Sequence, residues 1–114
     1  MIDFNPSHKA VLDDLLQGHP YIRAAKMFGY PAYFVGRKLC ICLYEQGVGI
    51  KLPAETAEKL LETDGNAAPF RPLGKPKMKE WVQINLENSE DYRGYESIFE
   101  ESIRYVLALS KGGK

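Results

Sequence analysis

The feature that most restricts the fold of this chain is a close succession of strand-forming stretches in its first half. These stretches are rich in aromatic and β-branched residues, and only two or three turn-forming residues separate them. Between residues 21 and 52 the stretches are YIRAAKMF, AYFV, KLCICLYE and VGIKL, and the breaks are GYP, GR and QG. Breaks this short join antiparallel neighbours, because a parallel connection needs about a dozen residues or more. The pattern therefore predicts a run of antiparallel strands.

Three stretches with helical spacing of apolar residues surround these strands. The first is predicted over residues 6 to 17, the second over PAETAEKLLET, and the third over about residues 90 to 109. Runs of sequential strands between helices favour an α+β fold over parallel βαβ units. We expect a two-layer sandwich, with an antiparallel sheet of about five or six strands and three helices on one face.

The segment between the second and third helices divides into a loop and a strand. NAAPFRPLGKP holds three prolines and a glycine, which predicts a loop or an irregular sheet edge. KMKEWVQINL is predicted to be a strand with two unlike faces. Met78, Val82, Ile84 and Leu86 form one face, and Lys77, Lys79, Trp81, Gln83 and Asn85 form the other.

The two cysteines lie in KLCICLYE, at Cys40 and Cys42. Both alternating sets of side chains in this stretch are largely apolar, which predicts a central strand covered on both faces. A spacing of two on a strand places both thiols on one face, about 6.6 Å apart, with no route to a disulfide between them. We predict buried, reduced thiols, because two sulfurs without further ligands are too few for a zinc site.

Composition predicts one soluble domain over residues 1 to 114, with a core from about residue 6 to residue 110. Lys plus Arg and Asp plus Glu both number 15, so the net charge is zero. A neutral chain has no global attraction to nucleic acid, which disfavours that class of partner. No apolar run approaches the length of about 18 residues that spans a bilayer, and the first residues lack the pattern of a signal peptide. The expected location is the cytoplasm, without a membrane partner.

No catalytic constellation is visible in the sequence. His8 and His19 lack a neighbouring nucleophile motif and are predicted to be surface or capping groups. Adjacent carboxylates such as Asp13 and Asp14 point in different directions on a helix, so they are predicted to be solvated. The GKPK stretch lacks the spacing of a phosphate-binding loop. We therefore predict no enzyme activity, no catalytic residues, no metal and no cofactor.

The candidate binding surface is the basic and aromatic face of the last predicted strand with the loop before it. Its members are Arg71, Lys75, Lys77, Lys79 and Trp81. Trp81 allows three interpretations: packing on the second face of the sheet against aromatics such as Tyr33 or Tyr44, contact with a protein partner or a second copy, and binding of nucleic acid, by stacking on a base, or of a small ligand. Neutral net charge places the nucleic-acid interpretation last.

Several of these stretches, taken in order, resemble the TfoX amino-terminal domain family, which is related in fold to the YjbR-like proteins. They are KMFGYPAYFVGRKLCICLYEQGVGIKLP at 26–53, PF at 69–70, GKPKMKEWVQI at 74–84, and SIRYVLALS in the last helix. The resemblance implies a two-layer fold similar to secretion chaperones and no established catalytic activity. In the competence regulators of that family a carboxy-terminal domain follows, and this chain ends where that domain would begin. The function it implies is a binding module acting through protein contacts or homodimerisation, with nucleic-acid binding or transcriptional co-regulation as the alternative.

Overall fold

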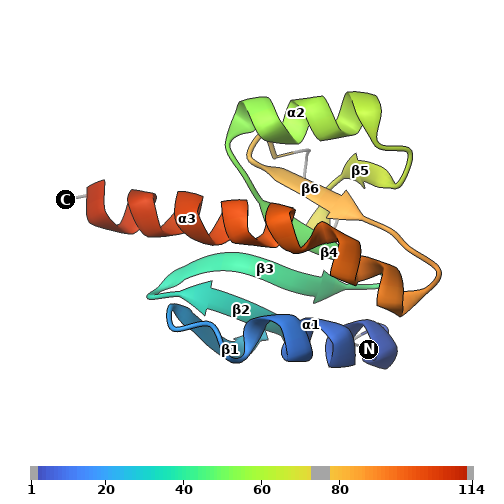
Figure 1. Cartoon of the computed structure of the whole chain (residues 1–114), viewed down its shortest axis with the longest axis horizontal. Coiled ribbons are helices and arrows are strands. Elements are labelled where there is room, and N and C mark those ends of the chain that lie inside the picture. Colours follow the sequence, from blue (N-terminus) through green and yellow to red (C-terminus); the bar gives the residue numbers. More distant parts are fainter. Residues whose placement is uncertain (1–2, 73–77, 113–114) are drawn as a thin grey trace.

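The computed structural model of the chain describes residues 3–72 and 78–112 and has the predicted α+β architecture (Figure 1). Its helices are α1 (Pro6–Leu16), α2 (Ala54–Thr63) and α3 (Glu96–Gly112), with a 3-10 helix, η2 (Ser89–Tyr95), ahead of α3. Its strands are β1 (Ile22–Met27), β2 (Tyr30–Val35), β3 (Lys38–Tyr44), β4 (Gly47–Lys51), β5 (Ala67–Pro69) and β6 (Trp81–Ile84). The six-stranded antiparallel sheet with three α-helices confirms the predicted fold class.

The strands follow the order β1-β2-β3-β4-β6-β5, and each neighbouring pair is antiparallel. The edges of the open sheet are therefore β1 and the three-residue β5, which is the irregular edge predicted from the prolines. In Figure 1, α1 and α3 cross in front of the sheet, and α2 lies beside β6 and β5. In the described part of the chain, all three α-helices contribute apolar residues to one core cluster, on one face of the sheet.

Local signals explain where two of the helices lie. The side chain of Asn5 accepts hydrogen bonds from the backbone N–H groups of Ser7 and His8, which satisfies two donors that the first turn of α1 leaves free. Pro6 then occupies the first turn, where its missing N–H costs nothing. The second helix lies within the predicted stretch and begins after Pro53.

The prediction of one continuous α-helix from about residue 90 was wrong at its start, because Ser89–Tyr95 is a 3-10 helix. Asn88 supplies the cap of this segment: its side chain accepts a hydrogen bond from the N–H of Glu90. Tyr92 is buried, and its hydroxyl donates to the backbone carbonyl of Ile84 at 2.7 Å. This tertiary contact ties the segment to β6, and spacing along the sequence does not encode it.

A β-bulge in the middle of the sheet overturns the prediction that both thiols share one face. The β2–β3 pairing shifts register where Tyr33 opposes Ile41 and Phe34 opposes Leu39, so Cys40 is an extra residue. Cys40 belongs to the helix-side core, and its Sγ lies 3.2 Å from the hydroxyl of Ser102 on α3. Cys42 belongs to a separate apolar cluster on the other face of the sheet. Both thiols are free and buried, as predicted.

The strand predicted from KMKEWVQINL begins late, at Trp81. A turn precedes it, in which the N–H of Trp81 donates to the carbonyl of Met78 at 3.2 Å. The turn breaks the expected alternation, so Met78 packs beside Trp81 instead of on the Val82 face. The assignment of Met78 to that face was therefore wrong. Val82 and Ile84 do face the helices, as predicted.

Candidate binding pocket

Aromatic side chains cover the sheet face that lies opposite the helices, here called the second face. Its buried cluster consists of Tyr30, Ala32, Cys42, Tyr44, Phe70 and Trp81. Ring centroids are 4.9 Å apart for Tyr30 and Tyr44, 5.7 Å for Tyr44 and Phe70, and 5.2 Å for Phe70 and Trp81. These spacings are typical of favourable aromatic pairs. In the described residues no helix packs on this face, and the aromatic row shields the sheet from water instead.

Phe70 reaches the centre of this row because of a glycine on β4. A Cβ atom on Gly49 would lie 2.8 Å from two ring atoms of Phe70 and 3.2 Å from the Sγ of Cys42. Distances below about 3.0 Å are closer than real Cβ contacts allow. The absence of a side chain at Gly49 therefore lets the Phe70 ring lie directly over the sheet.

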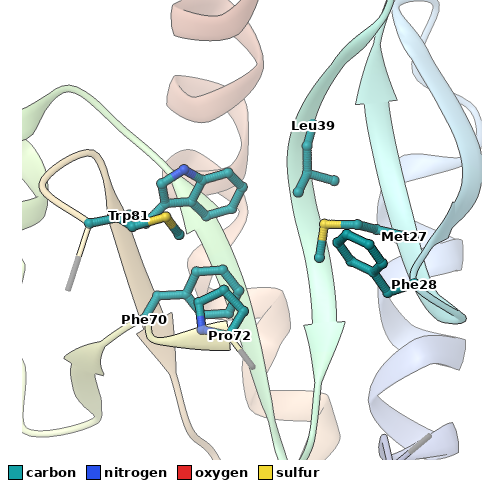
Figure 2. A pocket seen from close by; sticks show the side chains of 7 residues that line it. Met27, Phe28, Leu39, Phe70, Pro72 and Trp81 are labelled. Carbon is teal, nitrogen blue, oxygen red and sulfur yellow. The ribbon is translucent and has the colours of Figure 1, made fainter. Parts of the chain in front are cut away.

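Beside Phe70 the second face opens into an apolar pocket with a cavity volume of about 200 Å³. Met27, Phe28, Leu39, Phe70, Pro72, Met78 and Trp81 line it. Figure 2 shows two walls: Trp81, Phe70 and Pro72 on one side, and Leu39, Met27 and Phe28 on the other. The β1–β2 turn and β3 thus face the segment that surrounds β6. These seven apolar side chains provide a site for an apolar group, and the described lining includes no general acid or base.

Phe28 is the unusual member of this lining. The residue is 69% exposed, although it is large and hydrophobic. Phe28 and Gly29 form the two-residue turn between β1 and β2, and both have positive φ, at 51° and 88°. Such turns strongly prefer Asn-Gly, because positive φ is uncommon for residues with a Cβ. Phe28 therefore combines an unfavourable backbone conformation with an unfavourable exposure to water.

Trp81 forms a wall of the pocket, and the residue is only 8% exposed. The Nζ of Lys51 lies 5.7 Å from the centroid of the ring and 3.0 Å from Oε1 of Glu80. Of the three interpretations of Trp81, packing on the second face describes its position. Tyr44 belongs to the same cluster, whereas Tyr33 lies on the helix side and donates its hydroxyl hydrogen bond to Asp13.

The other predicted surface residues are only partly described. Arg71 and Lys79 are exposed and border the pocket residues Phe70, Pro72 and Met78 in the sequence. Lys75 and Lys77 lie outside the described residues. Sequence reasoning missed the opposite wall, formed by residues of the β1–β2 turn and by Leu39. The signal that was available is the Phe28-Gly29 pair, where an aromatic residue occupies a position that normally takes asparagine.

Among the residues that the structure describes, the pocket lining contains no titratable side chain. A titratable group elsewhere in the fold corrects a prediction. His8 was predicted to be a surface or capping group, but the residue is only 1% exposed and its Nδ1 lies 2.5 Å from the Ser89 hydroxyl oxygen. Burial lowers the pKa of His8, and the backbone carbonyls of Gln46 and Leu86 act in the opposite direction. His19 remains partly exposed, 3.3 Å from a carboxylate oxygen of Glu100. Among the described residues, no group of three His, Cys, Asp or Glu side chains could hold a metal ion.

Comparison with protein-family models, with curated proteins and with solved structures gave no match. The class that the fold itself defines is an α+β protein with an open antiparallel sheet, helices on one face and an apolar pocket on the other. Within the described part of the chain, no helix has the length and apolar character needed to cross a membrane.

Proposed function

We propose that this chain is a non-catalytic protein-binding module whose second-face pocket receives one apolar side chain of a partner. The observation that carries the proposal is Phe28, held exposed and at positive φ on the rim of the pocket. Neither property stabilises the folded chain, because exposure forgoes burial and positive φ disfavours a bulky side chain. Contact with a partner would recover the lost burial, as it does for the aromatic anchors of many interfaces.

The size and polarity of the pocket favour a side chain over a metabolite. Small-molecule sites commonly measure about 300–1,000 Å³ and place a few polar groups that fix the ligand. This pocket is smaller, at about 200 Å³, and its lining residues are apolar. A cavity of about 150 Å³ is enough to bind benzene. The pocket therefore matches one phenyl or leucyl group that projects from a protein surface.

The resemblance to the TfoX amino-terminal domain agrees with this function, and we propose membership of that family. The α+β architecture supports the assignment, because the resemblance implies an antiparallel sheet layered with helices. The cytoplasm is the compartment we propose, since buried free thiols such as Cys40 and Cys42 persist under reducing conditions.

The nucleic-acid alternative requires an aromatic ring face on which a base can stack. Trp81 offers little free surface, because Phe70 and Lys51 lie against its ring. Arg71 and Lys79 are exposed, but exposed cations on a chain of zero net charge do not single out nucleic acid. We therefore propose a protein as the class of partner.

Binding of an isolated side chain tests this function directly. Acetyl-Gly-Phe-Gly-amide is the probe, and acetyl-Gly-Ser-Gly-amide is the matched control peptide. We expect saturable shifts in the methyl NMR signals of Met27 and Met78 and in Trp81 fluorescence with the phenylalanine peptide, with a Kd on the order of 1 mM. Leu39→Gln should weaken binding, since it places an amide in the pocket wall, whereas Tyr21→Asn should not. Equal responses to the two peptides would contradict the proposal.

A further inference from the structure

On the second face, the exposed phenyl ring of Phe28 lies next to an apolar pocket that is large enough to hold a phenyl ring. Among the described residues, the exposed large hydrophobics are Tyr21 and Phe28. Of these two, Phe28 lines the rim of the pocket and Tyr21 does not. A cavity of about 200 Å³ exceeds the roughly 150 Å³ that holds a benzene molecule. The chain therefore displays, at the edge of its own pocket, the kind of group that the pocket can accommodate.

We propose that the partner of this pocket is a second copy of the chain, and that each copy inserts Phe28 into the pocket of the other. This inference rests on the proposed function, since it names the occupant of the same site. A two-fold axis beside the pocket would form both contacts at once, because a symmetric interface uses the same patch on both subunits. Phe28 and the pocket lie next to each other, so both belong to one patch, as a symmetric interface requires. A ring on the helix side would not belong to the same patch as the pocket.

The composition of the pocket suits a second phenyl ring. Met27 and Met78 have flexible thioether side chains, which adapt to an inserted ring and make favourable sulfur–aromatic contacts. Phe28 of the receiving copy is itself part of the lining, so the two equivalent Phe28 rings would meet near the axis as an aromatic pair. The positive φ of Phe28 belongs to the tight turn that presents the ring at the end of β1.

Charge does not oppose the pairing of identical chains. The net charge is zero, which removes the long-range repulsion that keeps many small domains apart. Next to the pocket, the carboxylate of Glu80 lies 3.0 Å from Lys51, so these two opposite charges offset each other beside Trp81. Arg71 and Lys79 are long and exposed, and their charged ends can remain in water at the rim.

Sedimentation velocity over a dilution series tests the inference on the full chain. We expect the wild-type protein to shift from monomer to dimer between about 1 μM and about 1 mM, a range typical of weak association. Phe28→Asn should raise the dimer Kd by more than about tenfold, as expected for loss of a central anchor. Tyr21→Asn, which removes the other exposed aromatic ring, should change the Kd by less than about twofold. Thermal unfolding of each variant confirms that it is folded.

A mixing experiment tests reciprocity. Phe28→Asn removes one of the seven lining side chains but keeps the other six, and Leu39→Gln retains an intact Phe28, so each variant alone should be largely monomeric. Their mixture can restore one of the two contacts, and we expect a heterodimer that is weaker than the wild-type dimer and more abundant than either homodimer. A mixture that associates no better than its components would overturn the exchange of Phe28.

The failures of the two proposals are distinguishable. If the wild-type chain stays monomeric at every concentration but its pocket binds the phenylalanine peptide, the second copy is the wrong partner and the binding module stands. If the chain is monomeric and the peptide does not bind, both proposals fail. If Phe28→Asn dimerises as well as the wild type, the dimer uses another surface and the inference is overturned.

Discussion

The ring of Phe70 lies against Gly49, with two ring atoms 2.8 Å from the place where a Cβ would stand. The contact joins the loop after β5 to the face of β4, two segments that are about 20 residues apart in the sequence. Phe70 in turn contacts both Tyr44 and Trp81. One missing side chain thus permits the aromatic row that covers the second face and builds one wall of the pocket.

Gly49→Ala should destabilise the protein and disturb this wall. The added methyl group overlaps the Phe70 ring, and a phenyl ring over a sheet cannot move away as easily as the end of a flexible chain. Overpacking of this kind costs about 1–3 kcal/mol. We expect that loss in the free energy of unfolding from denaturant titration, together with altered fluorescence of Trp81. Gly65→Ala is the control, because nothing lies within 4 Å of its added Cβ, and unchanged or raised stability is expected there.

Phe28→Asn should stabilise the folded monomer while it weakens dimerisation. Asparagine adopts positive φ more readily than phenylalanine, and the exposed ring contributes little burial to the fold. We expect the free energy of unfolding to rise by about 0.5–1 kcal/mol when it is measured at concentrations at which the wild type is monomeric. Tyr21→Asn should show no comparable gain. A clear loss of stability in Phe28→Asn would mean that the ring supports the fold, which contradicts its assignment as an anchor for a partner.

Both thiols should be unreactive in the native protein. Burial raises the pKa of Cys40 to about 11 and that of Cys42 to about 12, and the thiolate is the reactive form. At about pH 8 we expect Ellman's reagent to modify them more than about 100-fold more slowly than a surface thiol introduced as Tyr21→Cys. Two thiols should react rapidly once denaturant is added. Rapid modification of either cysteine in the folded chain would show that the bulge region opens readily.

His8 should make the stability of the fold depend on pH. Its folded-state pKa lies below the usual 6.5 because it is buried, so the unfolded chain binds a proton more readily than the folded chain. The free energy of unfolding therefore falls as the pH drops below about 6.5, by up to about 1.4 kcal/mol per pH unit. Denaturant titrations between about pH 7 and about pH 5 measure this slope. His8→Gln should flatten this dependence of the free energy of unfolding on pH. His19→Gln is the control and should leave the contribution of His8 in place.

Much of the architecture was predictable because its signals are local. Asn5 and Pro6 mark the start of α1, and glycine-containing breaks separate β1 to β4, so these boundaries follow from the preferences of a few adjacent residues. The candidate site was predicted only in part. Trp81 does lie on the second face, but strict alternation along KLCICLYE would place Leu39 on the same face as Ile41, whereas the bulge puts Leu39 beside the second-face cluster. A bulge depends on the register of the partner strand, which periodicity in one strand does not reveal.

The sequence by itself determined the class of fold, the helix-side core and the absence of a recognisable catalytic motif, because periodicity and turn chemistry act over a few residues. Only the tertiary structure decided what surrounds each side chain. It buried His8 against Ser89 and Tyr92 and placed Cys40 and Cys42 on opposite faces of the sheet. It also brought Phe28 to the rim of a pocket whose other wall lies more than 40 residues away in the chain. These outcomes depend on long-range packing and strand register, which arise only when distant segments meet.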